Sequence, residues 1–177
     1  MLKRWRIARQ NRAIVDLLYQ ELVSLTRQPK LYEAFGIADT FMGRFEALSV
    51  HVFLCLRRCR MDAELAPLAQ DLVDRFMADI DNTVRELGVG DQSVPKRMRK
   101  LAGIFYDRVR RYEDAFDQAS PTDQALAESF AGRAIERPEE APEGAAAGLA
   151  AYMITMEDRF RSVPTERILT GNLIGEN

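Results

Sequence analysis

Apolar side chains recur at three- and four-residue steps along most of the chain, a spacing that places them on one face of an α-helix. No segment alternates apolar and polar residues over the length of a strand, and no internal repeat is present. The first apolar run predicts a helix over about residues 9–27. Its apolar positions are Ile14, Leu17, Leu18, Leu22 and Leu25. The pattern therefore predicts an all-α fold.

The same pattern, together with residues that commonly start and end helices, predicts six further helices. They cover about residues 29–36, 40–60, 64–87, 94–118, 122–136 and 145–162, with a short turn after Pro164. Pro29 and either Asp39 or Thr40 are suited to helix starts, and Gly88 to a helix end. The acidic, proline-containing stretch 137–144 is predicted to be a loop. We expect a single-domain bundle of about seven helices.

The predicted helix 40–60 is apolar on two faces. One stripe contains Phe45, Leu48, Val52, Leu56 and Cys59, and the other contains Val50, Phe53 and Leu54. A helix that is apolar on both sides is usually surrounded by other helices. We therefore expect this helix at the centre of the bundle.

Length and composition limit the class of protein. The chain has 177 residues, of which 47% are hydrophobic and 29% charged, and its net charge is −2. These values suit one soluble domain with no overall attraction to DNA. No run approaches the ~18 apolar residues of a membrane span, and the charged N-terminus lacks the apolar core of a secretory signal. We divide the chain into a basic N-terminal segment, residues 1–12, and a helical domain, residues 13–177.

The candidate chemistry centres on one histidine. His51 is the single histidine, and Cys55 and Cys59 follow it on the same helical face. Three such ligands could contact zinc. Structural zinc sites, however, usually take four ligands from two chain segments, and the sequence has no second pair of cysteine or histidine residues. A catalytic triad would also have to use His51. We favour a histidine at the edge of the core and two reduced, buried thiols, and we expect no metal or cofactor.

Carboxylates are frequent in the predicted helix 64–87, where Asp74 and Asp81 share a face. A di-iron bundle would need Glu-x-x-His motifs on facing helices, and none occurs. A solvated acidic face is the favoured interpretation. The sequence therefore predicts a protein that is not an enzyme, and the remaining hypothesis of an enzyme depends on His51 together with this acidic helix.

Charge is unevenly distributed. Residues 62–91 contain eight acidic residues and two arginines, whereas residues 95–111 contain seven basic residues and one acid. Either neighbouring helices pair some of these charges and the others lie on a solvated surface, or a surface is left to face an anionic partner. We favour the first interpretation for the predicted helix 94–118. For the basic N-terminal segment, both interpretations stand equally, since Lys3, Arg4, Trp5, Arg6 and Arg9 could contact anionic lipid or ribosomal RNA.

Three stretches in the middle of the chain carry a resemblance. They are residues 35–46 running on through His51 to Arg57 and Arg58; residues 79–81, 84–91 and 94–98; and residues 105–108 with Tyr112. In this order and spacing, over about residues 30–120, they resemble the ubiquinol–cytochrome c chaperone family. The run from Arg85 to Arg97 is the most specific. This chain has Asp107 where the family usually has a small residue, and residues beyond 121 resemble it only as generic helix.

The resemblance implies a non-enzymatic chaperone that binds newly made cytochrome b during assembly of respiratory complex III. A second small assembly factor is an implied partner. The chain starts close to the domain, without the long N-terminal extension of mitochondrial relatives. We therefore expect a bacterial form in the cytoplasm, peripheral to the inner membrane (the matrix side in a eukaryote). The alternative function is a ribosome- or membrane-surface adaptor that acts through the basic N-terminal segment.

Candidate contact residues follow from the resemblance and from the expected groove. The partner-binding candidates are Arg44, Glu46, Arg85, Glu86, Asp91, Lys96, Arg97 and Arg108. An internal role, in helix bridging or loop ordering, is the alternative for each. Methionine and aromatic side chains adapt to varied apolar partners. The candidates for lining a groove are Met77, Met98, Phe105, Met153 and Met156, although a place in the core is the commoner role of each.

Overall fold

The computed structural model describes the backbone of residues 2–117 and 122–174, and the side chains of residues 11–117 and 122–174. The elements are α1 (Leu2–Thr26), α2 (Pro29–Glu33), α3 (Phe41–Cys59), a 3₁₀ turn (Ala63–Leu65), α4 (Ala66–Glu86), α5 (Val94–Asp117), α6 (Thr122–Phe130), α7 (Ala145–Arg161) and α8 (Thr165–Ile168). Within these residues there is no strand, only an isolated bridge between Ala131 and Ile135. The predicted all-α fold is confirmed.

Two predicted helix boundaries are wrong. The helix expected over 122–136 ends at Phe130, because Gly132 takes a positive φ of 66° and the chain turns back so that Ile135 N–H donates to Phe130 O at 3.0 Å. The first helix begins at Leu2 rather than near residue 9. The basic N-terminal segment is therefore continuous with α1. Gly88 ends α4 with a φ of 80°, as expected.

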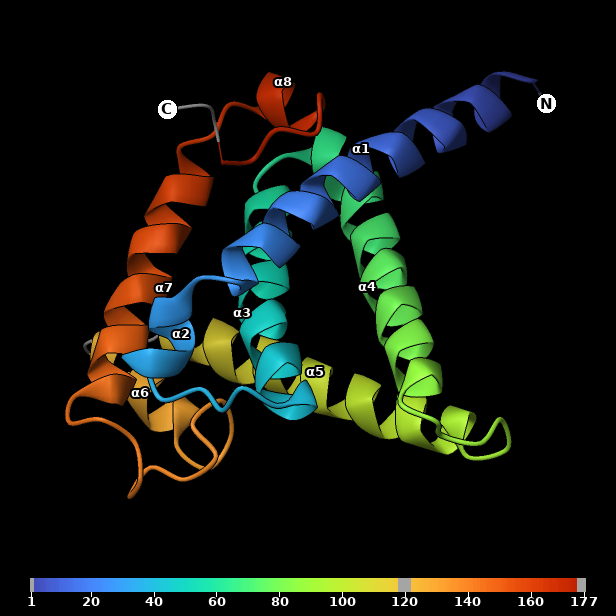
Figure 1. Ribbon diagram of the computed structural model, residues 1–177. Helices are drawn as coiled ribbons and strands as arrows, with labels where there is room; N and C mark the ends of the chain where they lie inside the picture. Colours follow the sequence, from blue (N-terminus) through green and yellow to red (C-terminus); the bar gives the residue numbers. More distant parts are fainter. Residues whose placement is uncertain (1, 118–121, 175–177) are drawn as a thin grey trace.

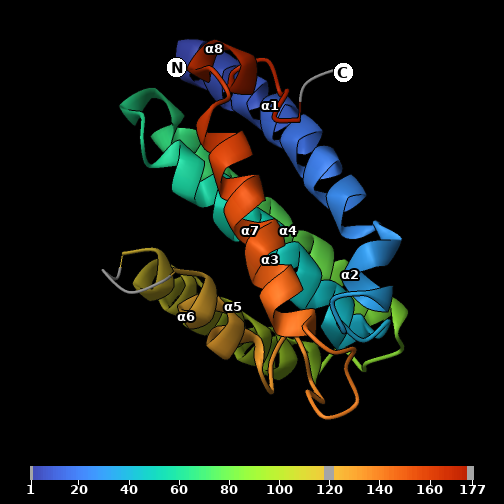
Figure 2. The same ribbon diagram turned by 90° about the vertical axis from the view of Figure 1, so that its left-hand side faces the viewer.

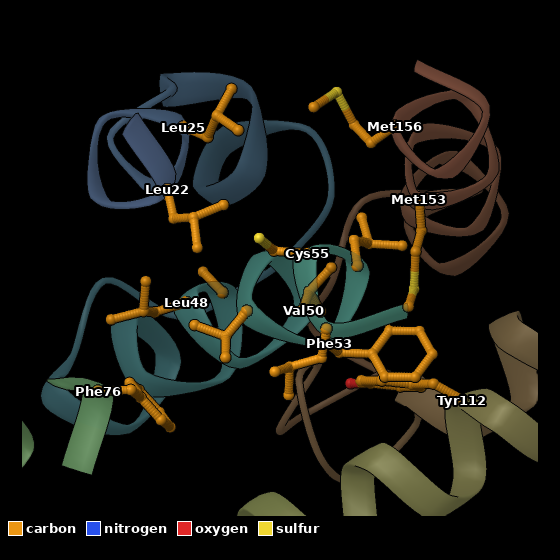
Figure 3. Packing of buried hydrophobic residues seen from close by; sticks show 14 of the residues in the cluster. Leu22, Leu25, Leu48, Val50, Phe53, Cys55, Phe76, Tyr112, Met153 and Met156 are labelled. Atoms are coloured by element: carbon orange, nitrogen blue, oxygen red, sulfur yellow. The ribbon is translucent and has the colours of Figure 1, made fainter. Parts of the chain in front are cut away.

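Helix α3 occupies the centre of the bundle, as its two apolar faces predict. Figure 1 shows α7 and α4 on either side of it, α1 crossing in front and α5 crossing below. Residues 45–56 of α3 are all buried. Figure 3 shows Leu22 and Leu25 of α1, Phe76 of α4, Tyr112 of α5 and Met153 of α7 approaching this helix from different directions. Each fully buried side chain of this size stabilises the fold by about 1.5–3 kcal/mol.

Three of the five candidates for lining a groove take the commoner alternative, a place in the core. Phe105 and Met153 are 0% exposed and Met156 is 5% exposed, so they belong to the core. Phe105 packs against Phe76 in a tilted arrangement with ring centroids 5.0 Å apart. Met77 and Met98 are half-buried against the same core. Helical periodicity identified these residues as apolar but could not distinguish a core face from a groove.

The C-terminal segment closes the bundle against α1. Figure 2 shows α8 and the chain after it beside α1. The backbone N–H groups of Leu173 and Ile174 both donate to Glu21 Oε2, at 2.6 and 3.0 Å. No helix in the described part of the chain is at once long and apolar enough to cross a bilayer.

Candidate functional site

A cleft of about 1240 Å³ opens between the C-terminal end of α1, α2, the start of α3 and the second half of α4. Residues 136–142, in the loop before α7, form its remaining wall. Three long helices contribute apolar side chains to it, and α2 and the two neighbouring loops contribute others. From the long helices these are Val23 of α1, Phe41, Phe45 and Leu48 of α3, and Ile80 of α4, together with Leu87 at the end of α4. The cleft therefore lies where three amphipathic helices meet without closing against one another.

Local sequence shapes the floor of the cleft. Thr40 caps α3, since its Oγ1 accepts a hydrogen bond from Gly43 N–H at 3.1 Å. Gly43 lets the preceding loop fold against the first turn of α3, because a Cβ at this position would lie 1.8 Å from the carbonyl oxygen of Ala38. Tyr32 OH donates to Thr26 O at 2.7 Å and joins α2 to the end of α1. These contacts hold the loop over residues 34–40 as one edge of the cleft.

The walls of the cleft combine exposed apolar surface with a charged rim. Leu87 is 56% exposed, and Val23 and Phe41 are half-buried. Ion pairs stand on the rim: Arg44 with Asp39 at 2.7 Å and Arg137 with Glu140 at 2.6 Å. Such exposed pairs stabilise a fold by only about 0–1 kcal/mol each, so they are free to rearrange around a partner. The arrangement suits the binding of an apolar segment with polar edges.

Of the eight predicted partner-binding residues, Arg44 lies on the rim of the cleft. Its guanidinium donates to Asp39 and lowers the pKa of that carboxyl group. Arg97 contacts the cleft indirectly, with its guanidinium carbon 5.7 Å from the centroid of the Phe41 ring. These two residues are placed to meet a partner that enters the cleft.

Glu46 and Arg108 lie elsewhere, buried against each other between α3 and α5. Glu46 is 2% exposed. Arg108 Nε donates to its Oε2 at 2.9 Å and Arg108 Nη2 to its Oε1 at 2.7 Å. This two-pronged ion pair bridges two helices and leaves little of either charge for a partner. The structure therefore gives both residues the helix-bridging role.

The remaining candidates surround the turn between α4 and α5. Arg85 donates to Asp81 at 2.6 Å and to Asp91 at 2.8 Å, which orders this turn. Glu86 and Lys96 are exposed and form no hydrogen bond or ion pair with any described residue. Arg85 and Asp91 thus pair with each other within the chain, but both are exposed and, like Glu86 and Lys96, stay accessible to a partner.

The side chains of Lys3, Arg4, Trp5, Arg6 and Arg9 lie outside the described residues, although their backbone belongs to α1. Their predicted contact with a membrane or a ribosome therefore stays a prediction.

His51 is completely buried and does not line the cleft. Its Nδ1 lies 2.7 Å from the carbonyl oxygen of Ala47, and its Nε2 lies 2.7 Å from Tyr152 OH. Because a carbonyl oxygen can only accept, Nδ1 carries the proton and Nε2 accepts from the tyrosine. Burial lowers the pKa of His51 to about 4, so the imidazole is neutral at pH 7. The histidine is a fully hydrogen-bonded core residue.

This burial predicts a dependence of stability on pH. In the unfolded chain the imidazole takes up a proton as the pH falls below about 6.5, whereas in the folded protein it does so only near pH 4. Stability is therefore lost as the pH falls, by roughly 2 kcal/mol between pH 7.5 and 5. Urea unfolding at both pH values measures the difference. The His51→Gln variant should show a smaller loss, and an equal loss in both proteins would contradict a buried neutral imidazole.

The two cysteines are free thiols inside the core. A hydrogen bond with Cys59 and burial hold the pKa of the Cys55 thiol well above its ordinary value. Among the side chains that the structure describes, no group of three His, Cys, Asp or Glu residues is arranged to hold a metal ion. The geometry around His51 is therefore that of a packed core.

Of the cleft lining, the sequence pointed to Arg44 but not to the apolar residues. Leu87 is the last apolar residue of the predicted helix 64–87, yet it lies one residue beyond α4 and is exposed. A signal was present: Leu87 directly precedes Gly88, where the helix was expected to end, and a residue at a helix terminus often leaves the buried face. Val23 and Phe41 gave no such signal, because partial burial depends on which helices stand opposite them.

Comparisons with known proteins place this arrangement in context. A family model described as ubiquinol-cytochrome C chaperone matches residues 33–175. The similarity thus extends well past residue 121, which corrects the expectation that the C-terminal part matches only as generic helix. The chain is also similar to the crystal structure of the Cbp3 homolog from Brucella abortus. The two share 38% identity with a TM-score of 0.83, over 100% of this chain and 97% of that chain. A comparison with curated proteins found no match.

Proposed function

Because this chain belongs to the ubiquinol–cytochrome c chaperone family, we propose that its cleft holds an apolar segment of newly made cytochrome b. The family makes it a chaperone for assembly of the ubiquinol–cytochrome c reductase complex. The identity of the client and the place where it binds are our proposal. The observation that carries it is the cleft itself, with apolar side chains from three helices and ion pairs on its rim.

The size of the cleft agrees with such a client. An α-helix about 10 Å across would fill 1240 Å³ over about 16 Å of its length, or roughly ten residues. That is part of one membrane-spanning helix. Helix-in-groove binding of this kind relies on apolar anchors spaced along one helical face. The cleft would thus shield a portion of a membrane segment from water before the segment is inserted or assembled.

The polar groups near the cleft support binding rather than catalysis. Both nitrogens of the lone imidazole are engaged inside the core, away from the cleft. The charged groups on the rim include two Arg–carboxylate ion pairs, which can form hydrogen bonds with the polar ends of a client segment. We infer that the protein acts by holding its client and does not transform it chemically.

Leu87→Glu tests the cleft with little risk to the fold, because Leu87 is 56% exposed. Peptides that span single transmembrane helices of cytochrome b, kept in mild detergent, serve as labelled ligands for fluorescence anisotropy. Placing a carboxylate against an apolar segment should weaken binding at least about tenfold, since full burial of a leucine contributes about 1.5–3 kcal/mol.

Met61→Glu is the matched control. Met61 is 53% exposed, does not line the cleft, and undergoes the same change from an apolar to an acidic side chain. It should bind the peptides as the parent protein does. Equal weakening by both variants, or no binding of any cytochrome b peptide, would refute the cleft as the client site.

We also propose that the protein works in a bacterial cytoplasm, at the inner membrane where cytochrome b is inserted. Its similarity to a protein of Brucella abortus supports a bacterial setting. A photo-crosslinker at position 87, compared with one at position 61, would identify the client in growing cells. The same experiment would show whether a second small assembly factor or the ribosome lies near the cleft.

A further inference from the structure

Four cations occupy the first two turns of α5: Lys96, Arg97, Arg99 and Lys100. All four are exposed, and no acidic residue occurs in α5 before Asp107. Lys96, Arg99 and Lys100 form no hydrogen bond or ion pair with any side chain that the structure describes. The N-terminal half of α5 therefore carries solvated cations, and the internal ion pairs of this helix lie in its C-terminal half.

The C-terminal half of α5 is different. Asp107 accepts hydrogen bonds from Arg110 and Arg111, both at 2.8 Å, and from Arg108 at 3.1 Å. The hydrogen bond from Arg111, followed by the other two arginines, lowers the pKa of Asp107 to about 2. Internal pairing is thus correct for this cluster. Helix α5 thus carries two basic clusters. The C-terminal cluster is paired with Asp107, whereas the N-terminal cluster has no acidic partner among the described side chains.

The unpaired cluster also stands where its charge is unfavourable. The N-terminus of a helix carries a partial positive charge, so cations in the first turns are repelled. Lys96 has Arg99 three residues and Lys100 four residues after it, and like charges at these spacings repel each other. Among the described side chains, no acidic group forms an ion pair with Lys96, Arg99 or Lys100 to compensate this repulsion. A bound anion would relieve both sources of repulsion.

The same face of α5 continues into an exposed aromatic residue. Gly103 follows one turn after the cations, and a Cβ at this position would meet no atom within 4 Å. Tyr106, on the next turn, is 57% exposed. A tyrosine combines an apolar ring with a polar hydroxyl group, a combination that suits the boundary between lipid headgroups and acyl chains. Cations and aromatic ring thus share one outward helical face.

We propose that this α5 basic face, consisting of Lys96, Arg99, Lys100 and Tyr106, docks on the anionic headgroups of a phospholipid membrane. Its cations are exposed on the helix surface and form no hydrogen bonds with described side chains. This arrangement suits diffuse electrostatic attraction to a charged surface rather than a specific phosphate-binding pocket. A single-stranded RNA would need several stacking aromatic side chains, and Tyr106 is the aromatic residue among the large apolar side chains exposed in the described part of the chain.

The position of this face connects it to the cleft. Arg97 belongs to the same two turns, and its guanidinium lies over the ring of Phe41, which lines the cleft. Docking through α5 would hold the cleft close to the bilayer surface. This consequence rests on the proposed function, whereas the docking itself does not.

The test is co-sedimentation of the whole protein with vesicles of phosphatidylcholine alone or with 30% phosphatidylglycerol. The protein should sediment with the anionic vesicles at low salt and be released by 0.5 M salt. The triple variant K96Q/R99Q/K100Q should bind roughly 100-fold more weakly, since each basic residue near an anionic surface contributes about fivefold. The same variant should unfold at an equal or higher temperature, because it loses repulsion. Tyr106→Ser should weaken binding by a smaller factor.

A matched triple variant, R159Q/R161Q/R167Q, removes three exposed arginines that already have partners within the chain. It should bind the anionic vesicles nearly as the parent does. Failure of the parent to bind them would overturn the proposal, as would equal loss in both triple variants. The docking proposal would also be contradicted if binding to anionic vesicles were abolished only by the change of Lys3, Arg4, Arg6 and Arg9 to glutamine. Binding of the protein to a polyuridine RNA but to no vesicles would contradict it as well. None of these outcomes involves cytochrome b, so they leave the client proposal to its own test.

Discussion

Replacing Arg108 with methionine is expected to lower the free energy of unfolding by about 3–5 kcal/mol. The reason is the carboxylate that would remain behind. Glu46 is 2% exposed, and three hydrogen bonds of 2.7–3.1 Å from Arg108 compensate its charge. Without the guanidinium, this charge must either stay unpaired in the core between α3 and α5 or bind a proton.

A double-mutant cycle distinguishes this explanation from a simple loss of packing. Because removing both charges leaves nothing uncompensated, the variant with Glu46→Leu and Arg108→Met should regain most of the stability that the single change loses. Urea unfolding of the parent, the two single variants and the double variant gives the coupling free energy between the two side chains. Arg110→Met is the control, since Arg110 is 66% exposed and should lose less than about 1 kcal/mol. Strict additivity of the two single changes would contradict the buried pair.

Gly43→Ala is expected to destabilise the protein by about 3 kcal/mol, the upper end of what overpacking a core usually costs. Helix propensity alone predicts the opposite sign, because alanine in a helix is favoured over glycine by about 1 kcal/mol. At residue 43 the cost of the steric clash exceeds the gain in helix propensity. A Cβ at residue 43 would lie 1.8 Å from the carbonyl oxygen of Ala38, and backbone atoms cannot rotate away as a side chain can. The loop that edges the cleft would have to move.

Gly103→Ala provides the control with the same chemical change. Gly103 lies within α5, and a Cβ there would meet no atom within 4 Å. Its replacement should raise the free energy of unfolding by up to about 1 kcal/mol. Thermal and urea unfolding of the two variants should therefore shift in opposite directions. Stabilisation by both would show that the loop over Ala38 yields easily and does not form a firm edge of the cleft.

The sequence was sufficient to predict which segments are helical and to predict that the helix over residues 40–60 lies at the centre of the bundle. Caps and glycine turns act over three or four residues, so Thr40 and Gly88 mark their helix ends without any knowledge of the fold. Apolar residues on both faces of residues 40–60 likewise require neighbours on both sides, which α3 has. The family resemblance came from the same local information, since its motifs are short runs.

The cleft could not be predicted in the same way. Its apolar walls come from α1, α3 and α4, and whether Val23 or Leu87 is covered depends on how these helices cross. Met153 and Leu87 both belong to apolar runs in the sequence, yet one is fully buried and the other is 56% exposed. Periodicity specifies that a face is apolar. It does not specify whether another helix, a loop or a partner covers that face.

Charge pairing shows the same division most clearly. The sequence by itself determined that α5 is basic and that α4 is acidic. Only the tertiary structure decided that Arg108 pairs with Glu46, 62 residues away, and that Lys96, Arg99 and Lys100 pair with no described residue. An ion pair requires two groups within about 4 Å. Between distant segments, that distance is fixed by the packing of whole helices and not by spacing along the chain.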